Sequence, residues 1–412
     1  MQISIFGEVK RKANFIVYKR NFTKTFMKTY RVTILGCRSR GTSAAKAYHA
    51  HPRTEIVALC DLVQERLDAL GKIVNVSTHF TDLDEMIQQT TPDIVAIPTA
   101  TDMHYPLCMR VLEYGVNIEV EKPLCVDLVQ ADAIIAKAKE KNARVVVHHQ
   151  RRVSPTMQAV AKALDEGKIG DLRYIYACGK GYYAGYGLMN IGTHVVNNML
   201  RFGGHCRSIM TQATAGGREL TPEDVLPSPA GMGIVTAEYT TSTLQFDNNV
   251  TGTLIQQRFP KVSSDAYVLE LYGTEGRLFW SELKGSWWLP TPHFVPDGTH
   301  DQWEKLTPIF PEHFDNSKGA NADDYCLVDE YVNALDENRE HECSGEEGCH
   351  VIEILMGIFE SAIYGTRVEL PQKNREHPLL RWLDENGLGA PKEMPRDYGT
   401  WLSQETERLY GQ

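Results

Sequence analysis

Short apolar runs alternate with amphipathic stretches over the first third of the chain. Apolar side chains at helical spacing separate the runs and predict connecting helices. Continuous apolar runs of this length are typical of buried parallel strands joined by helical crossovers. The expected strands are 31–35, 55–60, 93–97, 116–120 and 143–148, and the expected helices are 42–50, 64–73, 83–89, 104–114 and 128–141. The pattern predicts an α/β Rossmann domain, with a doubly wound parallel sheet, over residues 30–150.

The pattern changes after Pro155, where several segments alternate apolar and polar positions between turn-forming residues. Such segments are typical of antiparallel hairpins. The expected strands are 234–239, 242–246, 250–257, 266–271 and 277–280, and the expected helices are 156–166, 193–202, 322–337 and 346–364. We therefore expect a C-terminal α+β domain over residues 151–371 with a large, mostly antiparallel open sheet, followed by a surface-packed tail over 372–412.

The composition is that of a folded globular protein large enough for two domains: 412 residues, 42% hydrophobic and 23% charged. A net charge of −10 argues against nucleic acid as a partner, because such binding needs a basic face. No apolar run is long enough to span a membrane. Nine cysteines without a Cys-x-x-Cys pair favour a reducing, cytoplasmic compartment.

The first 29 residues differ in charge from the rest of the chain. Residues 1–31 carry eight basic side chains and one acidic side chain. We expect a flexible basic extension before a domain that begins near Met27, with a targeting segment as the alternative. In either case the extension lies outside the predicted chemistry.

A glycine-rich turn directly follows the first predicted strand and opens the first helix. It comprises Gly36, Cys37, Arg38, Ser39, Arg40 and Gly41. Glycines at this point let a dinucleotide's pyrophosphate approach the positive end of the helix dipole. Asp61 ends the second strand twenty residues later, where a carboxylate binds the adenosine ribose and repels a 2′-phosphate. NAD is therefore the expected cofactor, and Arg38 and Arg40, which could pair with a phosphate, leave NADP open.

Glu121-Lys122-Pro123, directly after a predicted strand, begins a series of segments that resembles the glucose-fructose oxidoreductase / inositol dehydrogenase / rhizopine catabolism (Gfo/Idh/MocA) family. Their order and spacing together make the resemblance specific. The other similar segments are Pro98–His104, Gln150–Pro155, Gly167–Gly170, Gly345–Gly348 and Gly365–Pro371. The resemblance covers about residues 30–371.

The resemblance implies that Lys122 and His194 are the catalytic acid/base groups. The family's acidic position four residues before the histidine is Asn190 here, and a second acidic position is Asn197. Without a carboxylate partner, we expect His194 to act mostly as a neutral hydrogen-bonding group while Lys122 moves the proton. The resemblance adds cofactor contacts at Pro98, Thr99, His104, Glu121 and Lys122, and substrate contacts at Lys122, Arg152, Tyr183, Asn190 and His194.

No metal site is expected. His148 and His149 are adjacent in a predicted strand and should face opposite sides. Cys343 and Cys349 lack the spacing of metal ligands.

These features predict a nicotinamide-dependent oxidoreductase that acts on a sugar, glycoside or cyclitol, with a homodimer or homotetramer implied by the resemblance. Two alternatives remain at this level. One is redox-neutral glycoside cleavage through a transient keto intermediate, and the other is a non-catalytic NAD- and sugar-binding regulator. The substrate, the carbon oxidised and the direction of reaction are not encoded in any motif, because specificity lies in loops.

Overall fold

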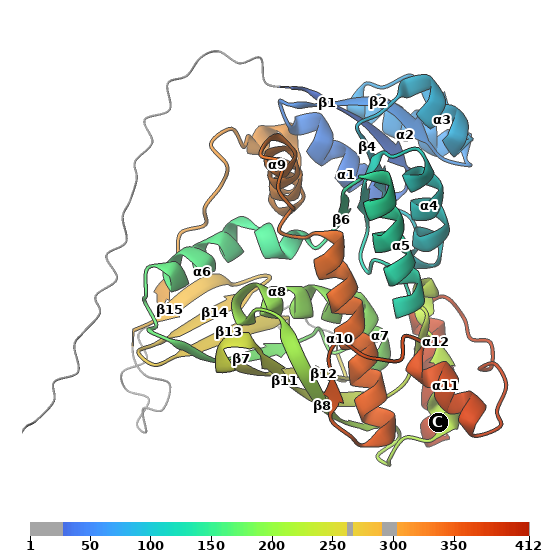
Figure 1. The fold of residues 1–412 in the computed structure, drawn as a ribbon, viewed down its shortest axis with the longest axis vertical. Coiled ribbons are helices and arrows are strands. Elements are labelled where there is room, and N and C mark those ends of the chain that lie inside the picture. Colours follow the sequence, from blue (N-terminus) through green and yellow to red (C-terminus); the bar gives the residue numbers. More distant parts are fainter. Residues whose placement is uncertain (1–27, 262–266, 291–302, 412) are drawn as a thin grey trace, which may run out of the picture.

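The computed structural model describes residues 28–261, 267–290 and 303–411 (Figure 1). The predicted basic extension lies outside these residues, apart from its last two. Between residues 30 and 147 the chain forms a six-stranded sheet of order β3-β2-β1-β4-β5-β6, and every strand pair in it is parallel. Its strands are β1 Tyr30–Leu35, β2 Thr54–Cys60, β3 His79–Phe80, β4 Ile94–Ile97, β5 Asn117–Val120 and β6 Val145–Val147. The predicted Rossmann sheet is confirmed.

Five helices connect these strands, as predicted: α1 Ser39–Ala50, α2 Gln64–Val74, α3 Leu83–Thr90, α4 Thr101–Glu113 and α5 Leu128–Lys141. Side chains at their ends fix where several begin and stop. Asp82 and Asp127 accept hydrogen bonds from the first-turn N–H groups of α3 and α5, and such a cap contributes about 1 kcal/mol. Asn75 and Asn142 end α2 and α5 in the left-handed conformation that asparagine tolerates.

The second half of the chain forms a nine-stranded sheet of order β16-β15-β14-β13-β7-β12-β11-β8-β17. The β7–β12 pair is parallel and the other pairs are antiparallel, so the predicted mostly antiparallel sheet is confirmed. Its strands are β7 Leu172–Cys178, β8 Cys206–Thr214, β11 Tyr239–Phe246, β12 Thr251–Gln257, β13 Val268–Gly273, β14 Arg277–Ser281, β15 Gly285–Leu289, β16 Glu304–Lys305 and β17 Val368–Glu369. Helices α6 Pro155–Asp165, α8 Thr193–Gly203 and α10 Gly345–Tyr364 cover one face (Figure 1).

One sequence-based expectation is corrected here, and the form of the tail, which had none assigned, is given. The strand predicted over 234–239 is broken, because Ala237 adopts a left-handed φ of 75°. Its first part, β10 Ile234–Val235, pairs with β9 Leu226–Pro227 in a separate ribbon, and β11 starts only at Tyr239. The tail contains two helices, α11 Pro378–Glu385 and α12 Tyr398–Tyr410, and Trp401 of α12 is fully buried.

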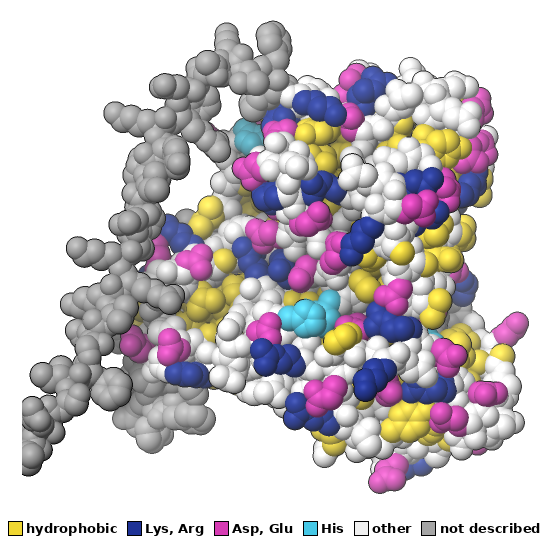
Figure 2. Space-filling model, in the orientation of Figure 1, with side chains coloured by type: hydrophobic (Ala, Val, Ile, Leu, Met, Phe, Trp, Pro, Cys, Tyr) yellow, Lys and Arg dark blue, Asp and Glu magenta, His cyan; other side chains and the backbone are white. Residues whose placement is uncertain are grey.

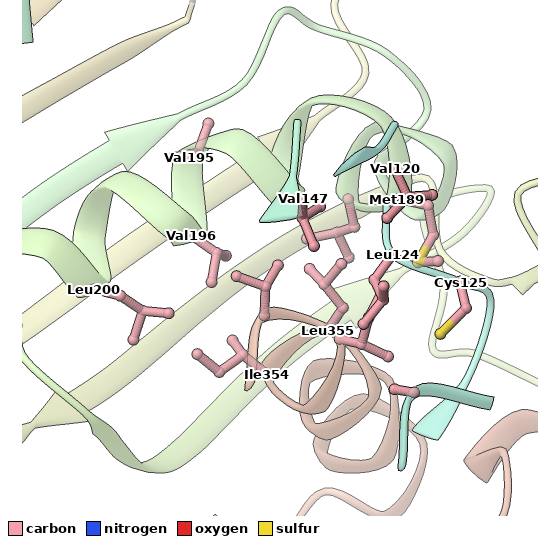
Figure 3. Packing of buried hydrophobic residues seen from close by; sticks show 14 of the residues in the cluster. Val120, Leu124, Cys125, Val147, Met189, Val195, Val196, Leu200, Ile354 and Leu355 are labelled. Carbon is pink, nitrogen blue, oxygen red and sulfur yellow. The ribbon is translucent and has the colours of Figure 1, made fainter. Parts of the chain in front are cut away.

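Buried hydrophobic side chains of the two halves pack against one another in a common core. Figure 3 shows side chains of the first sheet, among them Val120 and Val147, packed with Val196 of α8 and Leu355 of α10. Helix α9, Ala322–Asp336, follows the second sheet in sequence but packs on α1. Its Tyr331 is buried in the Rossmann core and donates to the carbonyl of Ile118 at 3.1 Å.

The surface carries no strong charge segregation on the face shown in Figure 2, where basic and acidic side chains are interspersed. Within the described parts of the chain, no helix combines the length and the apolar character needed to cross a bilayer.

Candidate active site

A cavity of about 600 Å³ opens at the carboxyl ends of β1, β2 and β4, where open α/β sheets bind ligands. The glycine-rich turn and the N-terminus of α1 form one wall of it. Its lining includes predicted cofactor residues Gly36, Arg38, Ser39, Arg40, Asp61, Pro98 and Thr99. Arg66 and Arg110 also line it, and this collection of arginines suits the two phosphates of a dinucleotide.

The turn between β1 and α1 requires glycine at two points. Gly36 adopts a φ of +113°, which other residues rarely reach. A Cβ on Gly41 would lie 1.9 Å from the carbonyl oxygen of Gly36, so a side chain there would force the turn open. Arg38 stands at the second glycine position of the common Gly-x-Gly-x-x-Gly motif, and its exposed side chain lies at the cavity.

Asp61 is held in place at the end of β2 by backbone groups. Its Oδ2 accepts from the Cys37 N–H at 2.8 Å, and its Oδ1 accepts from the Val63 N–H at 3.0 Å. Arg66 adds a contact to Oδ1 at 3.3 Å. Asp61 is one of the residues that line the cavity. This arrangement suits the vicinal hydroxyls of an adenosine ribose.

Pro98 and Thr99 line the cavity, and the buried Thr99 hydroxyl has no hydrogen-bond partner among the described residues. An unpartnered buried hydroxyl is costly unless a ligand or water satisfies it. The observation supports a polar ligand in this cavity, so the residues present fit NAD.

His104, an expected cofactor contact, is fully buried and is not among the residues that line the cavity. Its ring nitrogens lie 2.8 Å from the carbonyl oxygen of Pro123 and 3.3 Å from that of Thr99. Burial lowers the pKa of His104, which favours the neutral ring. The His104 side chain therefore links the turn after β4 to the turn after β5.

Lys122 follows β5 and points into the second half of the chain. Its Nζ donates to Oδ1 of Asn190 at 2.8 Å and to the Asn190 carbonyl at 3.0 Å. Burial is the main cause that lowers the pKa of Lys122 to about 8. The neighbouring Glu121 pairs with Arg40 at 2.5 Å. Although burial disfavours its charge, His148, Arg40 and Lys122 hold the pKa of Glu121 below its ordinary value.

His194 lies in the first turn of α8, after a π-helical turn over Leu188–Gly192. Burial, followed by the charge of Lys122, lowers its pKa well below the ordinary histidine value. The ring is therefore neutral at physiological pH. The ring of His149 lies edge-on to it at 5.6 Å, and Nδ1 of both rings is buried with no partner in the described structure.

Asn190 is also held from the tail of the chain. Its Nδ2 donates to the Tyr186 hydroxyl at 2.8 Å, and the ring of Tyr186 stacks on Tyr398 of α12 at 4.7 Å. The hydroxyl of Tyr398 accepts from the Tyr183 N–H at 3.0 Å. A chain of contacts thus runs from α12 to the ammonium of Lys122.

Two expected substrate residues, Tyr183 and Arg152, make contacts within the protein. Tyr183 is fully buried, bonds Glu405 through its hydroxyl and packs on Trp401, so its ring faces α12 and not a substrate. Arg152 donates to the Asn197 carbonyl at 2.7 Å and pairs with Glu347 at 3.3 Å. That position ties elements together at the junction of the two halves.

Three groups near Lys122 were not singled out as site residues from the sequence. In the sequence-based predictions His149 is named only in weighing a metal site, and Lys180 is not named, yet the positive charge of Lys180 helps lower the pKa of Lys122. Tyr398 belongs to the tail. His149 directly precedes the Gln150–Pro155 segment, which is a signal that could have identified it, whereas Lys180 and Tyr398 belong to no recognised motif.

Family models match most of the chain: "Oxidoreductase family, NAD-binding Rossmann fold" over residues 30–149 and "Oxidoreductase family, C-terminal alpha/beta domain" over 161–370. Among curated proteins, D-apiose dehydrogenase of Paraburkholderia graminis is 31% identical over 148 residues, 36% of this chain and 40% of that protein. Inositol 2-dehydrogenase of Rhizobium meliloti is 29% identical over 147 residues, 36% of this chain and 44% of that protein. The chain thus spans less than half the length of these curated relatives.

Among solved structures, levoglucosan dehydrogenase in complex with NADH and levoglucosan has a TM-score of 0.67 at 18% identity, covering 84% of this chain and 100% of that chain. An oxidoreductase from Agrobacterium radiobacter in complex with NAD+, L-tartaric acid and magnesium has a TM-score of 0.66 at 17% identity, covering 83% of this chain and 98% of that chain. These likenesses show the fold. The two family matches show that the chain belongs to the Gfo/Idh/MocA oxidoreductase family, whose Rossmann domain binds NAD.

Proposed function

We propose that this protein is an NAD-dependent oxidoreductase that acts on a hydroxyl or keto group of a sugar, glycoside or cyclitol, with Lys122 and His194 as its acid/base groups. The observation that carries the proposal is the position of Lys122. It follows β5 of the Rossmann sheet, and its buried Nζ donates to both oxygens of Asn190 in the second half. A ligand between the two halves would meet this ammonium.

Lys122 can serve as the base in alcohol oxidation because its pKa lies near 8. The neutral amine accepts the proton of a substrate hydroxyl, and the ammonium returns it in the reverse direction. Bound NAD supplies the hydride acceptor. The two Asn190 oxygens orient Nζ before substrate arrives, which lowers the entropic cost of proton transfer.

His194 supports the same reaction as a neutral group. Its pKa is depressed by burial and by Lys122, so the ring offers one N–H and one lone pair to a substrate hydroxyl. With no carboxylate at position 190, an imidazolium there would lack a counter-ion. We therefore assign proton transfer to Lys122 and substrate orientation to His194.

A polyhydroxylated substrate fits the polar groups around this point. In the described structure, both side-chain polar atoms of Asn197 and of Gln256 are buried without partners, as are Nδ1 of His149 and of His194. Unpartnered donors and acceptors of this kind suit a ligand rich in hydroxyls. The relatives named above, an apiose and an inositol dehydrogenase, act on such compounds by their names.

The proposal includes a cytoplasmic homodimer or homotetramer. Helices α6, α8 and α10 cover one face of the nine-stranded sheet, while Figure 1 shows no described helix on the other face. An open sheet face is suited to packing against a second copy. None of the nine cysteines is in a disulfide in the described structure, and seven of them are buried, which suits a reducing compartment.

The test is to identify the nucleotide that co-purifies with the chain and to screen sugars, glycosides and cyclitols by NADH absorbance. Lys122→Met should abolish turnover while NAD affinity is retained. Lys168→Met is the control, because the Lys168 ammonium lies over the Trp288 ring, away from the cavity. Full turnover by Lys122→Met would refute the assignment. Glycosidic cleavage without NADH accumulation would favour the redox-neutral alternative, and tight binding of NAD and sugar without any turnover would favour the regulator.

A further inference from the structure

Three potential metal ligands meet on the Rossmann half, away from the cofactor cavity. They are Nε2 of His51, Nε2 of His313 and Oδ1 of Asp329. The two ring nitrogens lie 3.3 Å apart, and the carboxylate oxygen lies 3.3 Å from His51 and 3.0 Å from His313. No metal site was expected from the histidine pair 148–149 or from the spacing of Cys343 and Cys349, and these three ligands form no sequence motif, because His51 and His313 are separated by 262 positions.

These three distances are those of ligands around a zinc ion. Zinc binds imidazole nitrogen at about 2.0 to 2.1 Å and carboxylate oxygen at about 2.0 to 2.2 Å in tetrahedral geometry, which places neighbouring ligand atoms about 3.3 Å apart. Hydrogen bonds alone explain the triangle poorly. Asp329 is taken as ionised. If both Nε2 atoms carry a proton, two N–H groups face each other, and if either lacks one, its lone pair faces the lone pairs of the Asp329 carboxylate.

The surroundings hold the ligand side chains in position. Asn333 donates to the second oxygen of Asp329 at 3.2 Å, and the Tyr325 ring packs against both histidine rings. The His51 side chain is buried, whereas that of His313 is 43% exposed, which provides an entry path for an ion. Oriented ligands of this kind are typical of protein metal sites.

One hydrogen bond to His51 opposes metal binding, because it must break when an ion binds. The Arg53 N–H donates to Nδ1 of His51 at 3.2 Å, so the neutral ring carries its proton on Nε2. Binding of a cation at Nε2 moves that proton to Nδ1, so the hydrogen bond from the Arg53 N–H is lost.

We propose that His51, His313 and Asp329 bind one Zn²⁺, with water in the fourth position. Two imidazoles with one carboxylate suit zinc and disfavour Mg²⁺ or Ca²⁺, which prefer oxygen ligands. The ion would join the C-terminal end of α1, the segment before α9 and α9 itself. Because α1 is 12 residues long, its two ends lie about 18 Å apart, and this separates the zinc from the phosphate end of the cofactor cavity. The role is structural.

The experiment uses the full chain without a histidine tag, freed of metal by a chelator, with Zn²⁺ measured by calorimetry and metal analysis. We expect one ion per chain. His313→Ala and Asp329→Asn should each weaken Zn²⁺ at least tenfold and remove the rise in Tm that added Zn²⁺ produces. His49→Ala, an exposed histidine in the last turn of α1, is the matched control and should bind Zn²⁺ like the parent chain.

A Co²⁺ complex distinguishes this site from the cysteines. Tetrahedral nitrogen and oxygen ligation should give visible d–d bands without a thiolate charge-transfer band. A thiolate band, unchanged Zn²⁺ affinity in both variants, or no binding by the parent chain would each overturn the proposal. The measurements need neither substrate nor NAD, so their outcome is independent of the proposed oxidoreductase activity.

Discussion

The ammonium of Lys122 and the side-chain oxygen of Asn190 lie 2.8 Å apart, although the two residues are 68 positions apart in the sequence. Lys122 follows a strand of the Rossmann sheet, and Asn190 lies in the turn before α8. Where the family resemblance implies a carboxylate, this chain has a neutral amide. The lysine is thus oriented by its partner without being stabilised as a cation by a full negative charge.

The first prediction concerns the pH dependence of turnover. Since the pKa of Lys122 is lowered to about 8, the fraction of neutral amine rises with pH through that value. The rate of substrate oxidation should therefore rise and level off, while the rate of carbonyl reduction should fall over the same range. Initial rates in both directions test this, and profiles that stay flat through this region would count against Lys122.

The second prediction uses the partner of the lysine. Asn190→Asp places a carboxylate against Nζ and should raise the pKa of Lys122, which moves the oxidation profile toward higher pH by about 1 to 3 units. Asn190→Ala removes the side-chain acceptor and should move the profile toward lower pH. Opposite displacements of the two variants support the contact, and shifts of the same sign would contradict it.

The third prediction concerns cofactor choice. Asp61→Asn removes the negative charge that two backbone N–H groups hold at the end of β2. We expect KM for NAD to rise about tenfold and KM for NADP to change less, because a 2′-phosphate is no longer repelled. Asp68→Asn on the exposed side of α2 is the control. An unchanged ratio of the two KM values would show that Asp61 does not select the cofactor.

The fourth prediction concerns the tail of the chain. Tyr398→Ala removes the ring stacked on Tyr186, so Asn190 and Lys122 lose a support and kcat/KM should fall about tenfold, with a shift of the pH profile. Tyr398→Phe keeps the stacked ring and should retain most activity. Ser403→Ala, on the exposed side of the same helix, should behave like the parent chain. If Tyr398→Ala left both the rate and the pH profile unchanged, α12 would have only a structural role.

The fifth prediction concerns the docking of α12. Trp401 is fully buried and donates to the Pro227 carbonyl at 2.8 Å. Trp401→Ala should cost about 3 to 5 kcal/mol of unfolding free energy, as large core truncations do. Denaturant unfolding measures this cost, and Trp287→Ala, a less buried tryptophan on β15, serves for comparison. Equal losses in the two variants would show that Trp401 does not anchor the helix.

Much of the first half could be predicted from the sequence because its signals are local. Strands such as β4, with all four residues buried, appear as continuous apolar runs, and the ends of α5 follow from Asp127 and Asn142. Strand β3 was missed because it is two residues long and half-buried. The break at Ala237 was missed because alanine gives no sign of a left-handed conformation.

The site was only partly predictable because its contacts join distant segments. The glycine-rich turn, Asp61, Lys122 and His194 each stand next to a recognisable element. The stacking of Tyr186 on Tyr398 and the meeting of His51 with His313 arise from tertiary packing alone. Spacing along the chain carries no information about such pairs, and for the same reason the burial of Tyr183 could not be seen.

The return of α9 to the Rossmann half determines how this protein can be recombined with its relatives. Leu327, Val328 and Tyr331 of α9 are buried in the core that contains Tyr48 of α1. A chimaera that exchanged residues 30–150 alone would therefore set a foreign α1 against a native α9. The unit to transplant is discontinuous, and a functional exchange of cofactor specificity would carry residues 322–336 along with the first 150.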